Sequence, residues 1–166
     1  VSANINGGDA DITIAELNSD NASTSPLVIN NQTGSFTLNG GTFTSIGTAG
    51  AQITDSSNVT IQGVTMQTPT TYGIYAQNVN GLNLNGNTII DVSLDGIYVQ
   101  NLTGTSSISG NTIRSLLSAF DNAIEVSTSG DASLDIDNNI ISILNTHNNS
   151  PKKTRLRHKK YVYKKG

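Results

Sequence analysis

Three carboxylates are the clearest candidates for acid–base chemistry in this chain of 166 residues. Asp95, Asp121 and Glu125 fall at similar places in neighbouring repeats of the sequence, so we expect them to lie close together. Any two neighbouring carboxylates of this kind can act as general acid and general base on a glycosidic bond. The alternative is structural, because carboxylates also cap corners of the backbone and keep a surface soluble. The sequence favours the structural role.

Arg114 is the only lysine or arginine among residues 1–150. Removal of a proton next to a sugar carboxylate requires a basic group in the binding groove, and Arg114 is the one candidate in this region. It directly follows Ile113, an inward position, so an ordinary solvated surface arginine is the simpler interpretation.

Two tyrosines, Tyr75 and Tyr98, share an outward position in neighbouring repeats. Stacked outward rings predict either a platform for sugar rings or a packing ladder covered by a loop. Asp135 and Asp137 alternate on one predicted strand and resemble half a calcium site. The glycine-rich nonapeptide period of calcium-binding β-rolls is absent, so we expect no metal site, with calcium the only cofactor considered.

A repeat along the chain must position these side chains. The segments 35–43, 58–66 and 81–89 align without gaps, and 106–113 and 133–141 continue the pattern. The first inward positions of these segments are Phe36, Val59, Leu82, Ser106 and Leu134. Their sequence numbers differ by 23, 23, 24 and 28, and a step of 24 back from Phe36 reaches Ile12. A second short strand repeats in register, beginning at Gly50, Gly73, Gly96 and Ala123. The chain therefore contains about six coils with at least two strands each.

Apolar and polar residues alternate within each segment, which places one set inside and the other outside. Gly and Asn follow the strands, and both accept the positive φ of a sharp corner. Asn87, Asn111 and Asn139 occupy one corner position, so their amides are expected to stack and to bond the next corner. The sequence predicts an all-β right-handed parallel β-helix. Antiparallel sandwiches do not require this period, and leucine-rich repeats need a consensus that is missing here.

Charge divides the chain into two parts. Residues 1–150 contain all twelve acids and one arginine, a net charge of −11, whereas Lys152 to Lys165 contain eight lysines and arginines. We expect residues 1–150 to form the β-helix and residues 151–166 to form a basic tail without regular structure. The tail's basic residues, interleaved with His158, Tyr161 and Tyr163, predict weak nonspecific binding of polyanions. No apolar run is long enough for a membrane helix, and we expect no membrane span.

The pattern of a strand followed by Gly-Asn-Thr-Ile, in 83–89 and 107–113, resembles repeats of the pectin-lyase-like superfamily. The resemblance covers roughly residues 10–145. That superfamily includes polysaccharide lyases and hydrolases, phage tailspikes and the passenger regions of autotransporter adhesins. Polygalacturonase-like members carry a paired Asp-Asp and Gly-His-Gly, whereas residues 1–150 lack adjacent aspartates and have no histidine before His147. The resemblance therefore argues for fold more than for chemistry.

The function expected from these features is that of a non-catalytic extracellular stalk for surface adhesion or carbohydrate contact. The expected partner is a polysaccharide or a host or cell-surface glycan. The expected location is secreted or at the cell surface, with the bacterial outer surface favoured. The alternative is a polysaccharide lyase or glycoside hydrolase whose active coil lies partly outside residues 1–166.

Overall fold

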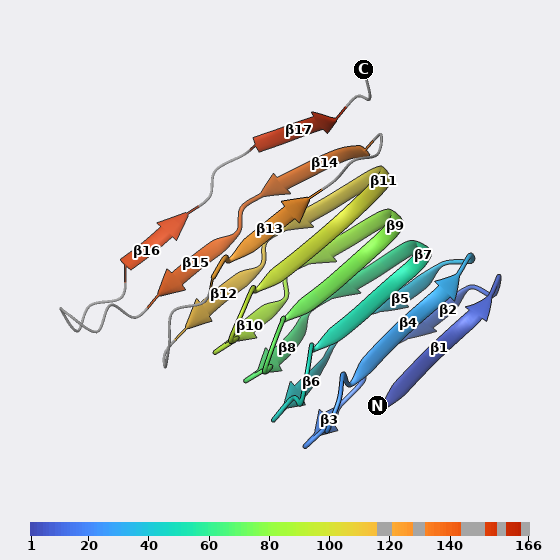
Figure 1. Ribbon diagram of the computed structural model, residues 1–166, viewed down its shortest axis with the longest axis horizontal. Coiled ribbons are helices and arrows are strands. Elements are labelled where there is room, and N and C mark those ends of the chain that lie inside the picture. The colour runs from blue at the N-terminus through green and yellow to red at the C-terminus, as the bar shows by residue number, and fades with distance from the viewer. Residues whose placement is uncertain (116–120, 128–131, 144–151, 156–158, 164–166) are drawn as a thin grey trace.

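The computed structural model describes residues 1–115, 121–127, 132–143, 152–155 and 159–163. The chain winds into a stack of coils, each contributing to two sheets (Figure 1). The larger sheet contains β1 (Ala3–Gly8), β2 (Ile12–Ile14), β4 (Leu27–Gln32), β5 (Phe36–Leu38), β7 (Ala51–Gln62), β9 (Ile74–Asn85), β11 (Ile97–Ser109), β13 (Ile124–Ser127), β14 (Ala132–Asp137) and β17 (Lys159–Tyr163). The smaller sheet contains β3 (Ser19–Asp20), β6 (Gly41–Thr44), β8 (Val64–Gln67), β10 (Thr88–Ile90), β12 (Thr112–Ser115), β15 (Ile140–Ile143) and β16 (Lys152–Arg155).

The strand registers confirm the repeat. Ile12 pairs with Phe36, Phe36 with Val59 and Val59 with Leu82, all in parallel. A register shift between Thr103 and Ser107 lengthens the repeat by one position within β11. Six parallel layers along the larger sheet complete about five turns, close to the expected six coils. No helix among the described residues is long and apolar enough to cross a membrane.

The core lies inside the stack, where period-two alternation places it. Side chains of Leu38, Ile61 and Leu84 form one inward column and have no exposed surface. Their neighbours Thr37 and Thr60 point outward and are partly exposed. A glycine directly precedes β9, where coils approach closely: a Cβ on Gly73 would lie 2.4 Å from the carbonyl oxygen of Gly96. Glycine at this corner therefore permits contact that any side chain would prevent.

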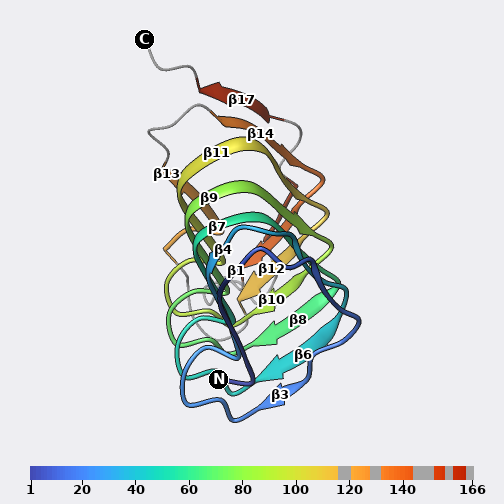
Figure 2. The same cartoon turned by 90° about the vertical axis from the view of Figure 1, so that its right-hand side faces the viewer.

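Asparagine and aspartate form another corner, in the left-handed region of backbone space. Asn31, Asp55, Asn78 and Asn101 occupy the same place in four successive coils, with φ between 50° and 55°. These residue types tolerate positive φ better than other residues with a Cβ. At this bend β7, β9 and β11 turn around the coil, and each remains a single strand (Figure 2).

The predicted asparagine ladder is present and fully buried. The backbone N–H of Asn87 donates to Oδ1 of Asn111 at 2.9 Å, and that of Asn111 donates to Oδ1 of Asn139 at 2.9 Å. The side-chain amides of Asn87, Asn111 and Asn139 donate to the backbone carbonyls of Ile61, Leu84 and Ile108, at 2.9, 2.9 and 2.8 Å. Each side-chain amide thus satisfies backbone polar groups of the preceding coil at a buried corner.

The basic tail differs from the expectation of no regular structure. Its residues Lys152–Arg155 and Lys159–Tyr163 form β16 and β17, which pair antiparallel with β15 and β14. Both strands lie at the end of the stack (Figure 1). The physical reason is the edge that a parallel stack leaves at its last layer, where unpaired N–H and C=O groups accept a further strand. Composition does not reveal such pairing.

The longest repeat follows Ile113. Ile89 pairs with Ile113 at a spacing of 24, whereas Ile97 pairs with Ile124 at a spacing of 27. Extra residues are therefore accommodated between β12 and β13, as the sequence predicts, and residues 116–120 of this segment lie outside the described residues.

Candidate functional site

The outer surface of the larger sheet carries two columns of aromatic and amide side chains over β7, β9 and β11. One column runs through Gln52, Tyr75 and Tyr98 to Glu125, and the other joins Thr54, Gln77 and Gln100. Tyr72 lies beside the first column. We call this surface the tyrosine face, defined by Gln52, Tyr72, Tyr75, Gln77, Tyr98 and Gln100.

Three tyrosine rings form one cluster on this face. The ring centroids of Tyr75 and Tyr98 are 5.8 Å apart with an angle of 18° between planes, so the two rings stack as their spacing predicts. Tyr72 lies 5.3 Å from Tyr98 and 5.5 Å from Tyr75. These separations are typical of favourable aromatic pairs. All three side chains keep part of their surface in solvent.

Tyr72 is the functional candidate that the sequence reasoning missed. It precedes the strand, so strand alternation alone does not place it on the outer surface. The coil period could have identified it. Ala49, Tyr72 and Asp95 each lie two positions before the paired residues Ala51, Ile74 and Ile97, so they occupy one column at the corner. That corner turns the Tyr72 ring toward the two stacked tyrosines.

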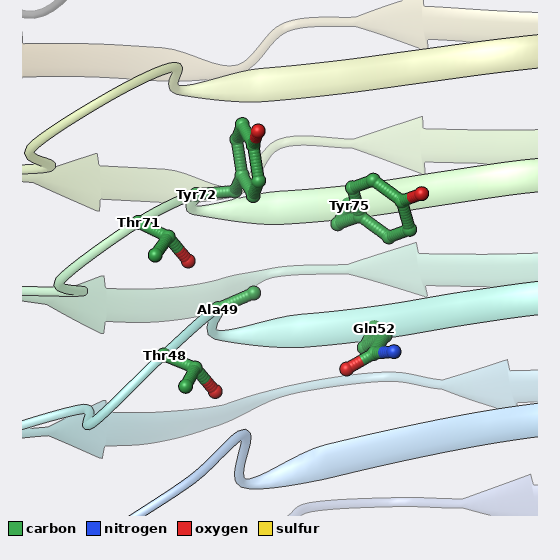
Figure 3. Close-up of a pocket in the computed structure, with 6 residues that line it drawn as sticks. All are labelled: Thr48, Ala49, Gln52, Thr71, Tyr72 and Tyr75. Atoms are coloured by element: carbon green, nitrogen blue, oxygen red, sulfur yellow. The ribbon is translucent and has the colours of Figure 1, made fainter.

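A hollow of about 240 Å³ lies beside the rings, on the N-terminal side of the cluster. It is lined by Thr48, Ala49, Gln52, Thr71, Tyr72 and Tyr75 (Figure 3). The hollow has a simple origin, because the preceding coil has Ala49 where the next has Tyr72, and Gln52 where the next has Tyr75. A step from smaller to larger side chains leaves space in front of the rings.

Hydrogen bonds orient the polar groups of the face. The hydroxyl of Tyr75 donates to Oε1 of Gln77 at 2.9 Å, and Nε2 of Gln77 donates to Oε1 of Gln100 at 3.2 Å. Thr54 continues the column by donating from Oγ1 to Oδ1 of Asn30 at 2.8 Å. The face thus presents amides and hydroxyls in fixed positions next to aromatic rings.

The surroundings of the rings disfavour additional negative charge. The pKa of Tyr72 is raised, first by burial and then by the charge of Asp95, the Tyr98 and Tyr75 phenols and Glu125. The pKa of Tyr75 is also raised, by burial first, then by Tyr98 and Asp55. Both phenols therefore stay protonated and able to donate hydrogen bonds at neutral pH.

Two of the three predicted carboxylates meet at one residue. Asp95 is buried and accepts the backbone N–H of Asn122 at 2.8 Å, while Oε2 of Glu125 accepts from Nδ2 of Asn122 at 2.6 Å. Both groups thus hold the corner that precedes β13. Asp121 is exposed, and its backbone N–H donates to the carbonyl of Leu94 at 2.8 Å. This arrangement corresponds to corner capping.

Arg114 lies apart from the tyrosine face. It is exposed on β12 in the smaller sheet, between Ile90 and Ser142 in register, whereas Tyr98 and Glu125 belong to the larger sheet. Asp135 and Asp137 lie on β14, where Oδ2 of Asp137 accepts from Asn138 at 2.6 Å. Within the described part of the chain, no three Asp, Glu, His or Cys side chains gather as metal ligands.

Comparison with known families agrees with the strand registers. The family model described as "Right handed beta helix region" matches residues 2–152. No curated protein and no solved structure matches the chain.

Proposed function

Because the chain belongs to the right-handed β-helix family, we propose that it is a non-catalytic extracellular stalk that contacts carbohydrate through the tyrosine face. In this role the stacked coils provide a rigid scaffold, and the outward columns of β7, β9 and β11 provide the contacts. Adhesion to a polysaccharide or to a cell-surface glycan is the biological use of such a surface.

The observation that carries the proposal is the cluster of Tyr72, Tyr75 and Tyr98 beside an open hollow. Tyrosine rings offer an apolar surface to the C–H groups of a sugar together with a hydroxyl for hydrogen bonding. They lose little conformational entropy on binding, because only two side-chain torsions are fixed. Aromatic rings with a few oriented polar groups are the usual composition of a small-molecule site.

The amide column supplies the polar half of the recognition. Gln77 and Gln100 are held by hydrogen bonds and are only partly buried. Side-chain amides both donate and accept, so they match sugar hydroxyls. Successive coils repeat these groups at about 4.8 Å along the axis, which suits a chain-like ligand that lies across several strands.

A binding role is favoured over cleavage by what the carboxylates do. Asp95 and Glu125 are both engaged with Asn122, and Arg114 belongs to the other sheet. A general acid and base must reach opposite sides of the bond that is cleaved. Carboxylates that cap the same corner support a structural assignment for this pair.

A glycan array tests the proposal. The wild-type protein is compared with Tyr75→Ala/Tyr98→Ala and with the control Thr37→Ala/Thr60→Ala, which also removes outward side chains from two neighbouring coils. We expect the tyrosine variant to lose roughly tenfold or more in affinity with a nearly unchanged melting temperature, because it loses exposed ring surface. Equal binding by all three proteins would refute the role of the face.

The enzymatic alternative has its own measurement. The protein is incubated with polyuronates and with neutral glycans, with and without calcium, and the products are analysed for unsaturated ends and new reducing ends. The proposal predicts no turnover above buffer. Reproducible product formation would establish a lyase or hydrolase instead.

A further inference from the structure

We infer that the tyrosine face selects neutral and amine-bearing sugars and rejects acidic ones. This inference rests on the proposed carbohydrate contact and adds the chemical class of the ligand.

The first support is the arrangement of charge around the rings. Asp55 is exposed at the corner that follows Thr54, and Glu125 follows Tyr98 in the tyrosine column. Asp95 lies one coil after Tyr72 at the corner beside the rings. Residues 1–113, which include all three tyrosines of the face, contain no lysine or arginine.

The same carboxylates raise the pKa values of two of the tyrosines. Asp95 and Glu125 contribute to the raised pKa of Tyr72, and Asp55 contributes to that of Tyr75. A carboxylate that disfavours ionisation of a nearby phenol also disfavours the approach of an anionic ligand to that phenol. The positions of the carboxylates and the direction of the pKa shifts therefore both disfavour an acidic ligand at the rings.

A sugar carboxylate placed in the hollow would meet no lysine or arginine among the residues that line it. Arg and Lys donors give the strongest hydrogen bonds to a carboxylate, and the one arginine of residues 1–150, Arg114, lies in the other sheet. An ammonium group on a sugar would instead be attracted by the faces of the tyrosines and by the nearby carboxylates. A neutral sugar keeps the ring stacking and amide contacts alone.

Three oligosaccharides of equal length test the selection: β-1,4-linked glucosamine hexamers, their N-acetylated counterparts and galacturonic acid hexamers. Binding is measured by calorimetry at low and at physiological salt. Only the part of each affinity that Tyr75→Ala/Tyr98→Ala removes is counted, because the basic tail offers acidic sugars a second, tyrosine-independent surface. The expected order is glucosamine first, N-acetylglucosamine second and galacturonate without tyrosine-dependent binding.

Charge-neutral variants separate a local effect from a global one. Glu125→Gln keeps an oxygen that can accept from Asn122, and its matched control Glu16→Gln keeps one for Asn18, which now donates to Glu16 at 2.7 Å. Both remove one negative charge, but Glu16 lies in the first coil. We expect Glu125→Gln to weaken glucosamine binding roughly two- to fivefold at low salt. The affinity of Glu125→Gln for N-acetylglucosamine should equal that of the wild type. Glu16→Gln should bind glucosamine as tightly as the wild type does.

Each result has a distinct meaning. Tyrosine-dependent binding of galacturonate as strong as that of glucosamine would overturn the selection while leaving carbohydrate contact intact. Equal weakening by Glu16→Gln and Glu125→Gln would also overturn it, since general attraction to the acidic residues of the whole stack would then explain the preference. Failure of all three hexamers and of the glycan array would instead reject the carbohydrate function itself.

Discussion

The asparagine ladder and the tyrosine face are both columns of similar residues repeated at the coil period, yet they differ in what they leave to the solvent. Asn87, Asn111 and Asn139 are fully buried, and each amide bonds a neighbouring coil. Tyr75 and Tyr98 stack with comparable regularity but keep ring surface exposed beside a hollow. The ladder uses its hydrogen bonds within the fold, whereas the rings of the face keep surface open to solvent.

This difference shows how to separate structural repetition from functional repetition in a solenoid. A column that satisfies all of its polar atoms internally stabilises the stack. Stacked rings that stay partly exposed beside a hollow, as those of Tyr75 and Tyr98 do, have surface that stacking within the fold leaves uncovered. Exposed ring surface next to a hollow therefore marks the location of the candidate site.

The largest expected effect on stability comes from placing a charge at an inward position instead of an outward one. Leu84→Asp places a carboxylate in a column with no exposed surface, and we expect it to cost about 4 kcal/mol or more of unfolding free energy. Thr60→Asp points outward and should change stability by about 0.5 kcal/mol. Urea unfolding followed by circular dichroism measures both. Similar losses in the two variants would mean that inside and outside are wrongly assigned.

The second prediction concerns the ladder itself. Asn111→Ala removes the acceptor of the Asn87 backbone N–H and leaves that buried group without its partner, so we expect a loss of about 3 kcal/mol. Asn85→Ala removes outward bonds from Ser107 and Ser109 at sites that water can reach, and should cost about 1 kcal/mol or less. Denaturation midpoints distinguish the two. If Asn111→Ala were as stable as Asn85→Ala, the asparagine ladder would not stabilise the fold as we expect.

The smallest expected effect is a pH dependence of stability at the tyrosine face. The folded-state pKa values of Tyr72 and Tyr75 lie above the ordinary value of 10.0, so the folded state keeps phenol protons that the unfolded state releases. This contribution is fully present below pH 10 and is lost as the pH rises through the raised folded-state values.

Melting temperatures measured from about pH 8 to about pH 11.5 test this dependence. We expect Tyr72→Phe/Tyr75→Phe to show a shallower decline than the wild type, because phenylalanine has no proton to lose. Identical slopes would mean that burial does not perturb these phenols. Comparison of the two proteins cancels the titration of the lysine-rich tail.

The fold was predictable because the stack imposes one rule on every coil. Each inward position must lie on the one below it, so Phe36, Val59 and Leu82 had to recur at a constant step. The asparagine ladder followed for the same reason, since a buried amide at one corner needs an equivalent partner at the next. Periodicity carries long-range information in such a chain.

The details of the candidate site were less predictable, because they depend on corners rather than on strands. Tyr72 and Asp95 both precede the strand register, where alternation gives no direction for a side chain. The carboxylates were expected near one another, but their engagement with Asn122 depends on the shape of the corner before β13. Pairing of β16 and β17 was missed because an open edge is a property of the stack, not of the tail.

Tyrosine fluorescence gives the most direct test of carbohydrate contact by the tyrosine face, since the chain has five tyrosines and no tryptophan. In the variant Tyr161→Phe/Tyr163→Phe the emission comes from Tyr72, Tyr75 and Tyr98 alone. Titration of this variant with the hexasaccharide that binds best on the array should give a saturable change in emission, with the same dissociation constant as calorimetry. Saturated binding by calorimetry with no change in emission would place the sugar elsewhere and contradict the account.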